Sequence, residues 1–138
     1  MKKIALHSVP RSGSSWLGAI LDSHSNIAYR FQPLFSYAFK SYLTESSSKE
    51  DIDCFFKKIY ESDDAFINRL EDKERGIIPN FEKHTTEAIV YKEVRYHNIL
   101  KNLLNTSPDL NVIGLIRNPL ATINSWLNAP KEFRKELN

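Results

Sequence analysis

The sequence predicts an α/β fold of three layers, in which helices cover both faces of a parallel sheet. Short apolar runs at residues 3–9, 88–93 and 110–116 are typical of strands that are buried on both faces. Stretches with the apolar spacing of amphipathic helices lie between these runs. Strands that alternate with helices form parallel sheets, because each connection lays a helix across one face. In such sheets ligands bind beyond the carboxyl ends of the strands.

The first elements follow one another closely. The run at 3–9 ends at a proline, which favours a buried strand over a helix. Residues 14–23 then carry the apolar stripe of a helix with one buried face, and a serine at either of its first two positions can cap it. Residues 27–33 are expected to form an extended segment or a loop, because Pro33 disfavours helical geometry at the preceding residue.

The middle of the chain is predicted to be helical. Residues 34–43 are rich in aromatic side chains and are expected to form a helix. Ser48 and Asp51 have the spacing of a capping box at the start of the next helix. The buried side of that helix is expected to carry Ile52, Phe55, Phe56 and Tyr60. A shorter helix is expected at 64–72, followed by a charged loop.

The last third contains two of the three strands. Residues 88–93 are expected to form the second strand. Residues 97–104 are expected to form a helix with inward apolar residues at Ile99, Leu100, Leu103 and Leu104. Residues 110–116 form the third strand. Pro119 is expected near the first position of the following helix, where its missing N–H costs nothing. A terminal helix is expected at 131–137.

Composition limits the possible classes of function. The 138 residues are 41% hydrophobic and 26% charged, as in an ordinary globular domain. The net charge of +2 gives no field that would indicate nucleic acid or membrane as a partner. No apolar stretch approaches the ~20 residues of a membrane span, and the first apolar run is too short for a secretion signal, so we expect a cytoplasmic protein. The single cysteine excludes an intramolecular disulfide, and the four histidines lack ligand spacing, so no metal is expected.

The segment 10–16, Pro-Arg-Ser-Gly-Ser-Ser-Trp, joins the first strand to the first helix. Gly13 lets the backbone turn tightly, and the N–H groups at the start of the helix favour a bound anion. Arg11 adds a fixed fork of donors for phosphate or sulfate oxygens. The P-loop pattern G-x-x-x-x-G-K-[ST] follows the same logic, but here Ser14 replaces the lysine and the first glycine is missing, which argues against ATP or GTP hydrolysis. A turn that is merely rich in serine and glycine is the alternative.

This segment resembles the 5'-phosphosulfate loop of sulfotransferases that use 3'-phosphoadenosine 5'-phosphosulfate (PAPS), usually written P-[KR]-[ST]-G-[ST]-[ST]-W-L. The resemblance implies a sulfotransferase-type fold related to the nucleotide triphosphate hydrolases. It also implies that the loop holds the 5'-phosphate and the sulfuryl group. The donor-binding residues would be Arg11, Ser12, Gly13, Ser14 and Ser15. Trp16 would stack or pack near the nucleotide, with plain helix packing as the alternative.

A second motif supports the resemblance. In the family, a strand ends in an arginine and the next helix presents a serine eight residues later, both directed at the 3'-phosphate. Arg117 follows the third strand here, and Ser125 lies eight residues later, about two helical turns on. The segment 115–126 is similar to the family segment. Taken alone, Arg117 is typical of a surface arginine and Ser125 of an ordinary helical serine. Because ATP lacks the 3'-phosphate, this pair would select PAPS.

The catalytic residues depart from the family pattern. Many carbohydrate sulfotransferases carry Arg-x-Glu-Pro after the first helix, and its glutamate is a natural general base; this chain has Gln32 there, which can only hydrogen-bond the acceptor. By resemblance, Lys92 in the second strand would stabilise the bridging oxygen, Glu93 is a possible base, and Arg11 would stabilise the leaving phosphate. Strand alternation points Lys92 and Glu93 to opposite faces, so we expect only one of them to reach the site. A salt-bridged surface pair is the alternative.

Residues 1–138 are therefore expected to form one sulfotransferase-like domain. Family domains continue beyond the helix of Ser125, so a truncated product, a fragment, or a compact form completed by homo-oligomerisation all remain open. The leading hypothesis is a sulfotransferase that moves a sulfuryl group from PAPS to a hydroxyl on a saccharide or small metabolite. A truncated relative that binds the nucleotide or an anion without turnover is the second hypothesis, and a small-molecule kinase is the third.

Overall fold

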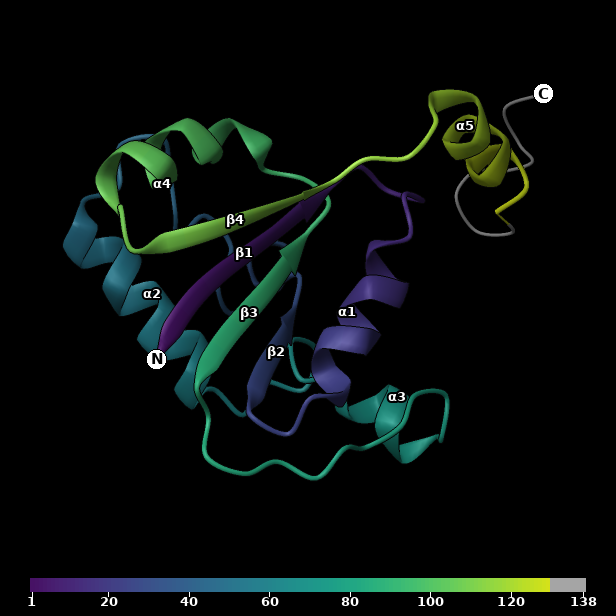
Figure 1. The fold of residues 1–138 in the computed structure, drawn as a ribbon, viewed down its shortest axis with the longest axis horizontal. Helices are drawn as coiled ribbons and strands as arrows, with labels where there is room; N and C mark the ends of the chain where they lie inside the picture. The colour runs from purple at the N-terminus through teal and green to yellow at the C-terminus, as the bar shows by residue number, and fades with distance from the viewer. Residues whose placement is uncertain (130–138) are drawn as a thin grey trace.

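A computed structural model describes residues 1–129 of the chain as a four-stranded sheet flanked by helices (Figure 1). The strands are β1 (Lys2–Ser8), β2 (Ile27–Phe31), β3 (Ala88–Glu93) and β4 (Leu110–Leu115). They lie in the order β2-β3-β1-β4, and every neighbouring pair is parallel. The predicted α/β fold with a parallel sheet is confirmed, and the segment after the first helix forms its edge strand.

Helices cover the two faces of the sheet. Helix α1 (Ser14–Ser23) packs on one face through Leu17 and Leu21, while α2 (Lys49–Glu61) and α4 (Leu100–Thr106) lie on the other (Figure 1). The remaining helical elements are shorter or lie further from the sheet: η1 (Pro33–Phe35), α3 (Leu70–Glu74), η2 (His97–Ile99) and α5 (Pro119–Leu127). No helix in the described part of the chain is both long and apolar enough to cross a bilayer.

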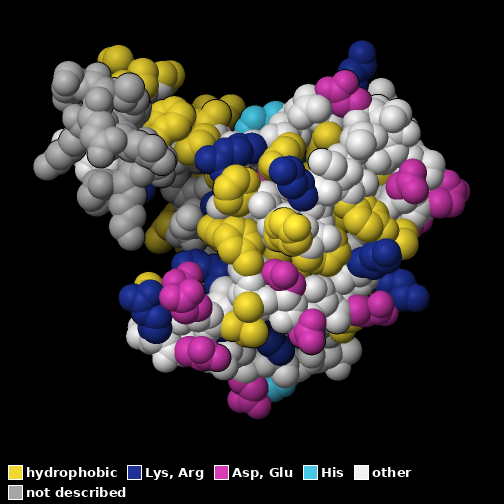
Figure 2. All heavy atoms as spheres, turned by 180° about the vertical axis from the view of Figure 1, so that it is seen from behind, with side chains coloured by type: hydrophobic (Ala, Val, Ile, Leu, Met, Phe, Trp, Pro, Cys, Tyr) yellow, Lys and Arg dark blue, Asp and Glu magenta, His cyan; other side chains and the backbone are white. Residues whose placement is uncertain are grey.

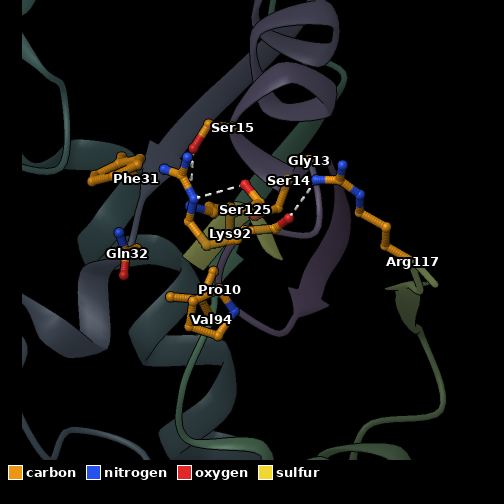
Figure 3. Close-up of a pocket in the computed structure, with 11 residues that line it drawn as sticks. Pro10, Gly13, Ser14, Ser15, Phe31, Gln32, Lys92, Val94, Arg117 and Ser125 are labelled. Atoms are coloured by element: carbon orange, nitrogen blue, oxygen red, sulfur yellow. Dashed lines mark hydrogen bonds between the residues drawn. The ribbon is translucent and has the colours of Figure 1, made fainter. Parts of the chain in front are cut away.

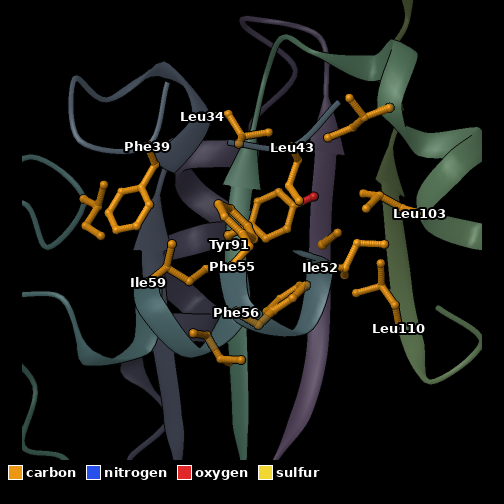
Figure 4. Close-up of a cluster of buried hydrophobic side chains, with 14 of the residues drawn as sticks. Leu34, Phe39, Leu43, Ile52, Phe55, Phe56, Ile59, Tyr91, Leu103 and Leu110 are labelled. Atoms are coloured by element: carbon orange, nitrogen blue, oxygen red, sulfur yellow. The ribbon is translucent and has the colours of Figure 1, made fainter. Parts of the chain in front are cut away.

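The larger core lies between the sheet and α2. Tyr91 of β3 packs edge-on against Phe55, with the two ring centroids 5.6 Å apart, and also contacts Phe56 (Figure 4). All three rings are almost completely buried. Each ring contributes about 1.5–3 kcal/mol by leaving water, so this cluster fixes β3 against α2. Because the strands are parallel, the carboxyl ends of β1, β3 and β4 then meet at one edge of the sheet.

Helix α2 begins as predicted. Ser48 Oγ accepts a hydrogen bond of 3.1 Å from the Asp51 N–H, and Asp51 Oδ2 accepts one of 2.8 Å from the Ser48 N–H. This reciprocal pair is the capping box. The buried side of the helix differs from the prediction at one position, where Ile59 is buried and Tyr60 is partly exposed.

Other helical predictions were wrong. The only helical element that reaches into residues 34–43 is the short turn η1, because Ser36 bonds to the backbone there: its Oγ donates to the Pro33 carbonyl and accepts from the Phe39 N–H. The helix expected at 64–72 starts at Leu70, since the Asp64 carboxylate accepts from the N–H groups of two following residues and forms a turn.

Two further predictions concern the C-terminal part of the chain. Leu104 was expected to face inward but is exposed. The helix expected at 131–137 lies outside the described residues.

Candidate functional site

The loop between β1 and α1 has the geometry of an anion site. Gly13 adopts φ 98°, and Arg11 also has a positive φ of 65°. Ser12 Oγ donates a hydrogen bond of 2.7 Å to the Val9 carbonyl, which closes the turn. Gly13 occupies the N-cap of α1 and no side chain caps the helix there, so the serine cap that the sequence suggested is not formed. The first N–H groups of the helix are therefore left to a ligand or to water.

The second motif lies against this loop. Arg117 follows β4, and its Nη1 donates a hydrogen bond of 2.9 Å to the Arg11 carbonyl. Ser125 of α5 accepts one of 3.2 Å at Oγ from Arg11 Nε. Asn118 caps α5 through its side chain, which accepts from two N–H groups of the first turn. The structure thus brings together two segments that are more than 100 residues apart in the sequence.

These residues line a cavity of about 310 Å³ at the carboxyl end of the sheet. Figure 3 shows Ser14, Ser15, Lys92 and Ser125 close together, with Phe31 and Gln32 to one side. The lining residues are Pro10, Arg11, Gly13, Ser14, Ser15, Phe31, Gln32, Lys92, Val94, Arg117 and Ser125. They include three cations, while no carboxylate is present among the described residues that line the cavity. Positive charge without a fixed counter-charge favours an anionic ligand.

Lys92 reaches the cavity from β3. Its Nζ donates a weak hydrogen bond of 3.4 Å to Ser15 Oγ and lies 4.6 Å from the centroid of the Phe31 ring. Burial lowers the pKa of Lys92 to about 8. The nearby Glu93 opposes this shift, whereas Arg69 and Arg95 add to it. A bound anion would restore the charge of the ammonium group, because an opposite charge favours the ionised form.

Gln32 lines the cavity from the corner that follows β2. Its φ of 44° lies in the left-handed region, which is uncommon for a residue other than glycine. The side-chain oxygen Oε1 is buried and has no hydrogen-bond partner within residues 1–129. A buried carbonyl without a donor is unfavourable, so this atom is suited to accept a hydrogen bond from a ligand.

Three predicted site residues do not reach the cavity. Glu93 is fully buried on the other face of β3, where Oε1 accepts a hydrogen bond of 2.7 Å from the Leu34 N–H. Of these two neighbours only Lys92 lines the cavity, which is the alternation expected along a strand. Ser12 turns its hydroxyl to the loop backbone, and Trp16 is 72% exposed on α1, so it does not pack against the body of the domain.

Three lining residues, Pro10, Phe31 and Val94, were not predicted as site residues from the sequence. Pro10 and Val94 directly follow predicted strands, so their position at the sheet edge was a usable signal. Phe31 is the neighbour of Gln32, and its ring contacts Lys92 and also lies 5.0 Å from the Arg69 guanidinium. Both contacts depend on the pairing of β2 with β3, which the sequence did not specify.

Comparison with known proteins agrees with this arrangement. The family model described as the sulfotransferase domain matches residues 1–137, which include both loop motifs and all the lining residues. The chain belongs to the sulfotransferase domain family. No curated protein and no solved structure matches it. Family membership indicates sulfuryl transfer as the general chemistry of this sulfotransferase-family chain. No group of three or more potential metal ligands comes together in the described range of residues.

Proposed function

We propose that this protein transfers a sulfuryl group from PAPS to the hydroxyl group of a saccharide or small metabolite. The observation that supports this most strongly is the meeting of the two predicted phosphate-binding motifs at one cavity. Arg11, Lys92 and Arg117 line that cavity, and none of its lining residues within 1–129 is a carboxylate. A cavity of this kind fits a ligand that carries several negative charges.

The donor would be held from two sides. The start of α1, with Gly13, Ser14 and Ser15, would bind the 5'-phosphate and sulfuryl oxygens. Arg117 and Ser125 would bind the 3'-phosphate, which distinguishes PAPS from ATP. Arg11 Nε donates to Ser125 Oγ, so the two side chains lie close enough to bind the same ligand. The start of α1 has no side-chain cap, which supports this assignment because its N–H groups can donate to phosphate oxygens.

The residues around the cavity can stabilise charge during transfer. PAPS supplies the activated sulfuryl group, and the nucleotide gains negative charge as that group leaves. Arg11 and Lys92 are positioned to stabilise the added charge, which is the main requirement in reactions of this type. Lys92 is held in place by the Phe31 ring and Ser15, so its ammonium group needs little reorganisation.

The acceptor would approach along Phe31. A neighbouring cavity of about 280 Å³ shares this residue with the donor cavity and is also lined by Phe66 and Arg69. Figure 2 shows the face opposite to that of Figure 1, where hydrophobic side chains gather with basic and acidic side chains around them. Gln32 can accept a hydrogen bond from the acceptor hydroxyl, but it cannot take the proton at neutral pH. We therefore expect slow transfer in the wild-type protein.

Calorimetric titration tests the donor site. The proposal predicts that 3',5'-adenosine bisphosphate binds more tightly than ATP or sulfate, and a preference for ATP would overturn it. A transfer assay with labelled PAPS and a panel of hydroxyl acceptors then tests the reaction. Binding of the bisphosphate without any transfer would show a nucleotide-binding protein in place of an enzyme.

A further inference from the structure

Glu93 is a buried carboxylate outside the cavity. Its side chain has no exposed surface, and Oε2 has no hydrogen-bond partner in the described structure. Burying a carboxylate is unfavourable unless hydrogen bonds compensate for the lost hydration. The contact that compensates here is made by Oε1, which accepts a hydrogen bond of 2.7 Å from the Leu34 N–H. Glu93 therefore holds the turn η1, which directly follows Gln32.

The corner at residues 32–34 is fixed to β3 at two points. The Gln32 N–H donates a hydrogen bond of 2.8 Å to the Lys92 carbonyl, and the Leu34 N–H donates to the next residue of the strand. The N–H groups of Phe35 and Ser36 both donate hydrogen bonds of 3.1 Å to the Gln32 carbonyl. These bonds keep Gln32 in its left-handed conformation, which costs about 1–3 kcal/mol and persists only where the surroundings impose it.

We propose that Glu93 is a positioning residue: by holding the Leu34 N–H, it keeps the side-chain amide of Gln32 at the cavity wall. Neighbouring residues on the two faces of β3 then both contribute to the site. Lys92 enters the cavity directly, whereas Glu93 acts from the opposite face through the corner. This inference rests on the proposed function for the role of Gln32 toward the acceptor, while the link between Glu93 and the corner rests on contacts alone.

Two substitutions separate positioning from general-base catalysis. Glu93→Gln keeps an oxygen that can accept from the Leu34 N–H but removes the carboxylate, and Glu93→Leu removes the acceptor. We expect Glu93→Gln to retain transfer from PAPS to the best acceptor of a panel of glucosamine, phenol and ethanolamine, within about threefold. We expect Glu93→Leu to lose about tenfold or more in the rate of transfer, and we expect Gln32→Ala to lose a similar amount. A carboxylate that served as general base would instead lose about 10²–10⁴-fold in Glu93→Gln.

A double-mutant cycle identifies the route of the effect. If Glu93 acts through Gln32, adding Glu93→Leu to the Gln32→Ala variant should raise the activation free energy of transfer by less than about 0.5 kcal/mol, which is roughly a twofold loss in rate. Independent, additive losses would overturn the proposal, and so would a fully active Glu93→Leu. The affinity for 3',5'-adenosine bisphosphate should stay within about threefold of wild type in both Glu93 variants, because Arg11, Lys92 and Arg117 line the cavity whereas Glu93 lies on the other face of β3 and does not.

Nuclear magnetic resonance gives a readout that needs no acceptor. In Glu93→Gln the Leu34 amide and the Gln32 side-chain amide should resonate near their wild-type positions, and in Glu93→Leu both should move. Movement of the Leu34 signal alone would refute the positioning role. If wild type binds no bisphosphate and sulfates no acceptor, the proposed function fails, but these resonances still decide the role of Glu93. If Glu93→Leu does not fold, Glu93→Gln decides, because loss of transfer or displaced Gln32 resonances in that variant would refute the inference.

Discussion

The guanidinium group of Arg117 donates a hydrogen bond of 2.9 Å to the backbone carbonyl of Arg11. This bond joins the segment after β4 to the loop between β1 and α1, and β1 and β4 are themselves paired from Lys3 and Leu110 to Ser8 and Leu115. Arg11 in turn donates from its side chain to Ser125. The two motifs are thus parts of one site, and a change in either should affect the same ligand.

Arg117→Ala should weaken the binding of 3',5'-adenosine bisphosphate. Loss of a hydrogen bond to a charged group costs about 1.5–3 kcal/mol, so the dissociation constant should rise roughly tenfold to hundredfold. Arg75→Ala is the matched control, since Arg75 is an exposed arginine that pairs with Glu71 away from the cavity. Calorimetry on both variants checks the prediction, and equal losses in the two would contradict it.

The protonation state of Lys92 should make anion binding depend on pH. In the free protein its pKa is lowered to about 8 by burial, so the site loses a positive charge as the pH rises through this value. The bound anion favours the ammonium form, which places the midpoint in the complex at a higher pH. Affinity for the bisphosphate should therefore fall between about pH 7 and pH 9.5 in wild type. Lys92→Arg stays charged, so its affinity should change much less, and parallel curves would argue against Lys92 as a ligand.

Much of this site could be predicted from the sequence, because its parts are local. The loop around Gly13 and the pair Arg117 and Ser125 are short motifs next to apolar strands, and the structure places them together. The corner at Gln32 could not be predicted as a corner. Aromatic residues after Pro33 suggested a helix, but the side chain of Ser36 forms hydrogen bonds with the backbone there instead.

The roles of Lys92 and Glu93 show the same limit. Alternation along a strand predicts that neighbours face opposite sides, and this holds. Which side carries the loop after β1 depends on the strand order and on the face that α1 covers. Both are tertiary properties, so the sequence could not decide that Lys92 reaches the cavity and Glu93 holds a turn.

Gly13→Ala should destabilise the protein and weaken anion binding, because φ 98° is strained for any residue with a Cβ. The left-handed region costs about 1–2 kcal/mol for such residues. Gly76→Ala is a close control, since Gly76 also has a positive φ of 66° and neither added Cβ meets an atom within 4 Å. Both variants should lose similar stability in thermal unfolding, but only Gly13→Ala should lose affinity for the bisphosphate. Equal affinities would mean that the loop backbone does not contact the ligand.

Stability should depend on pH through Glu93. Burial raises the pKa of this carboxyl from 4.5 to about 7, although backbone N–H groups and nearby cations oppose the shift. The folded state therefore binds the proton more tightly than the unfolded state. The titration of Glu93 therefore adds about 3 kcal/mol to the free energy of unfolding at low pH. This stabilisation is fully present below about pH 4.5 and is lost as the pH rises through about 7. Glu93→Gln lacks this titration, so its stability relative to wild type should increase from pH 5 to pH 8, as urea unfolding can measure. Glu45→Gln, at an exposed position, should show no such trend.

Gln32→Glu should accelerate transfer, because it places a proton acceptor at the cavity wall, where the wild-type chain has only an amide. General-base catalysis contributes about 10²–10⁴-fold, so a gain near the lower limit is expected for a base that the surrounding residues have not been selected to orient. The rate should rise with pH as the new carboxyl ionises, and Lys92 nearby should favour its charged form. Gln32→Asn, which shortens the amide without adding a base, is the control. If Gln32→Glu transfers no faster than Gln32→Asn, the amide position does not contact the acceptor hydroxyl, and the proton must leave by another route.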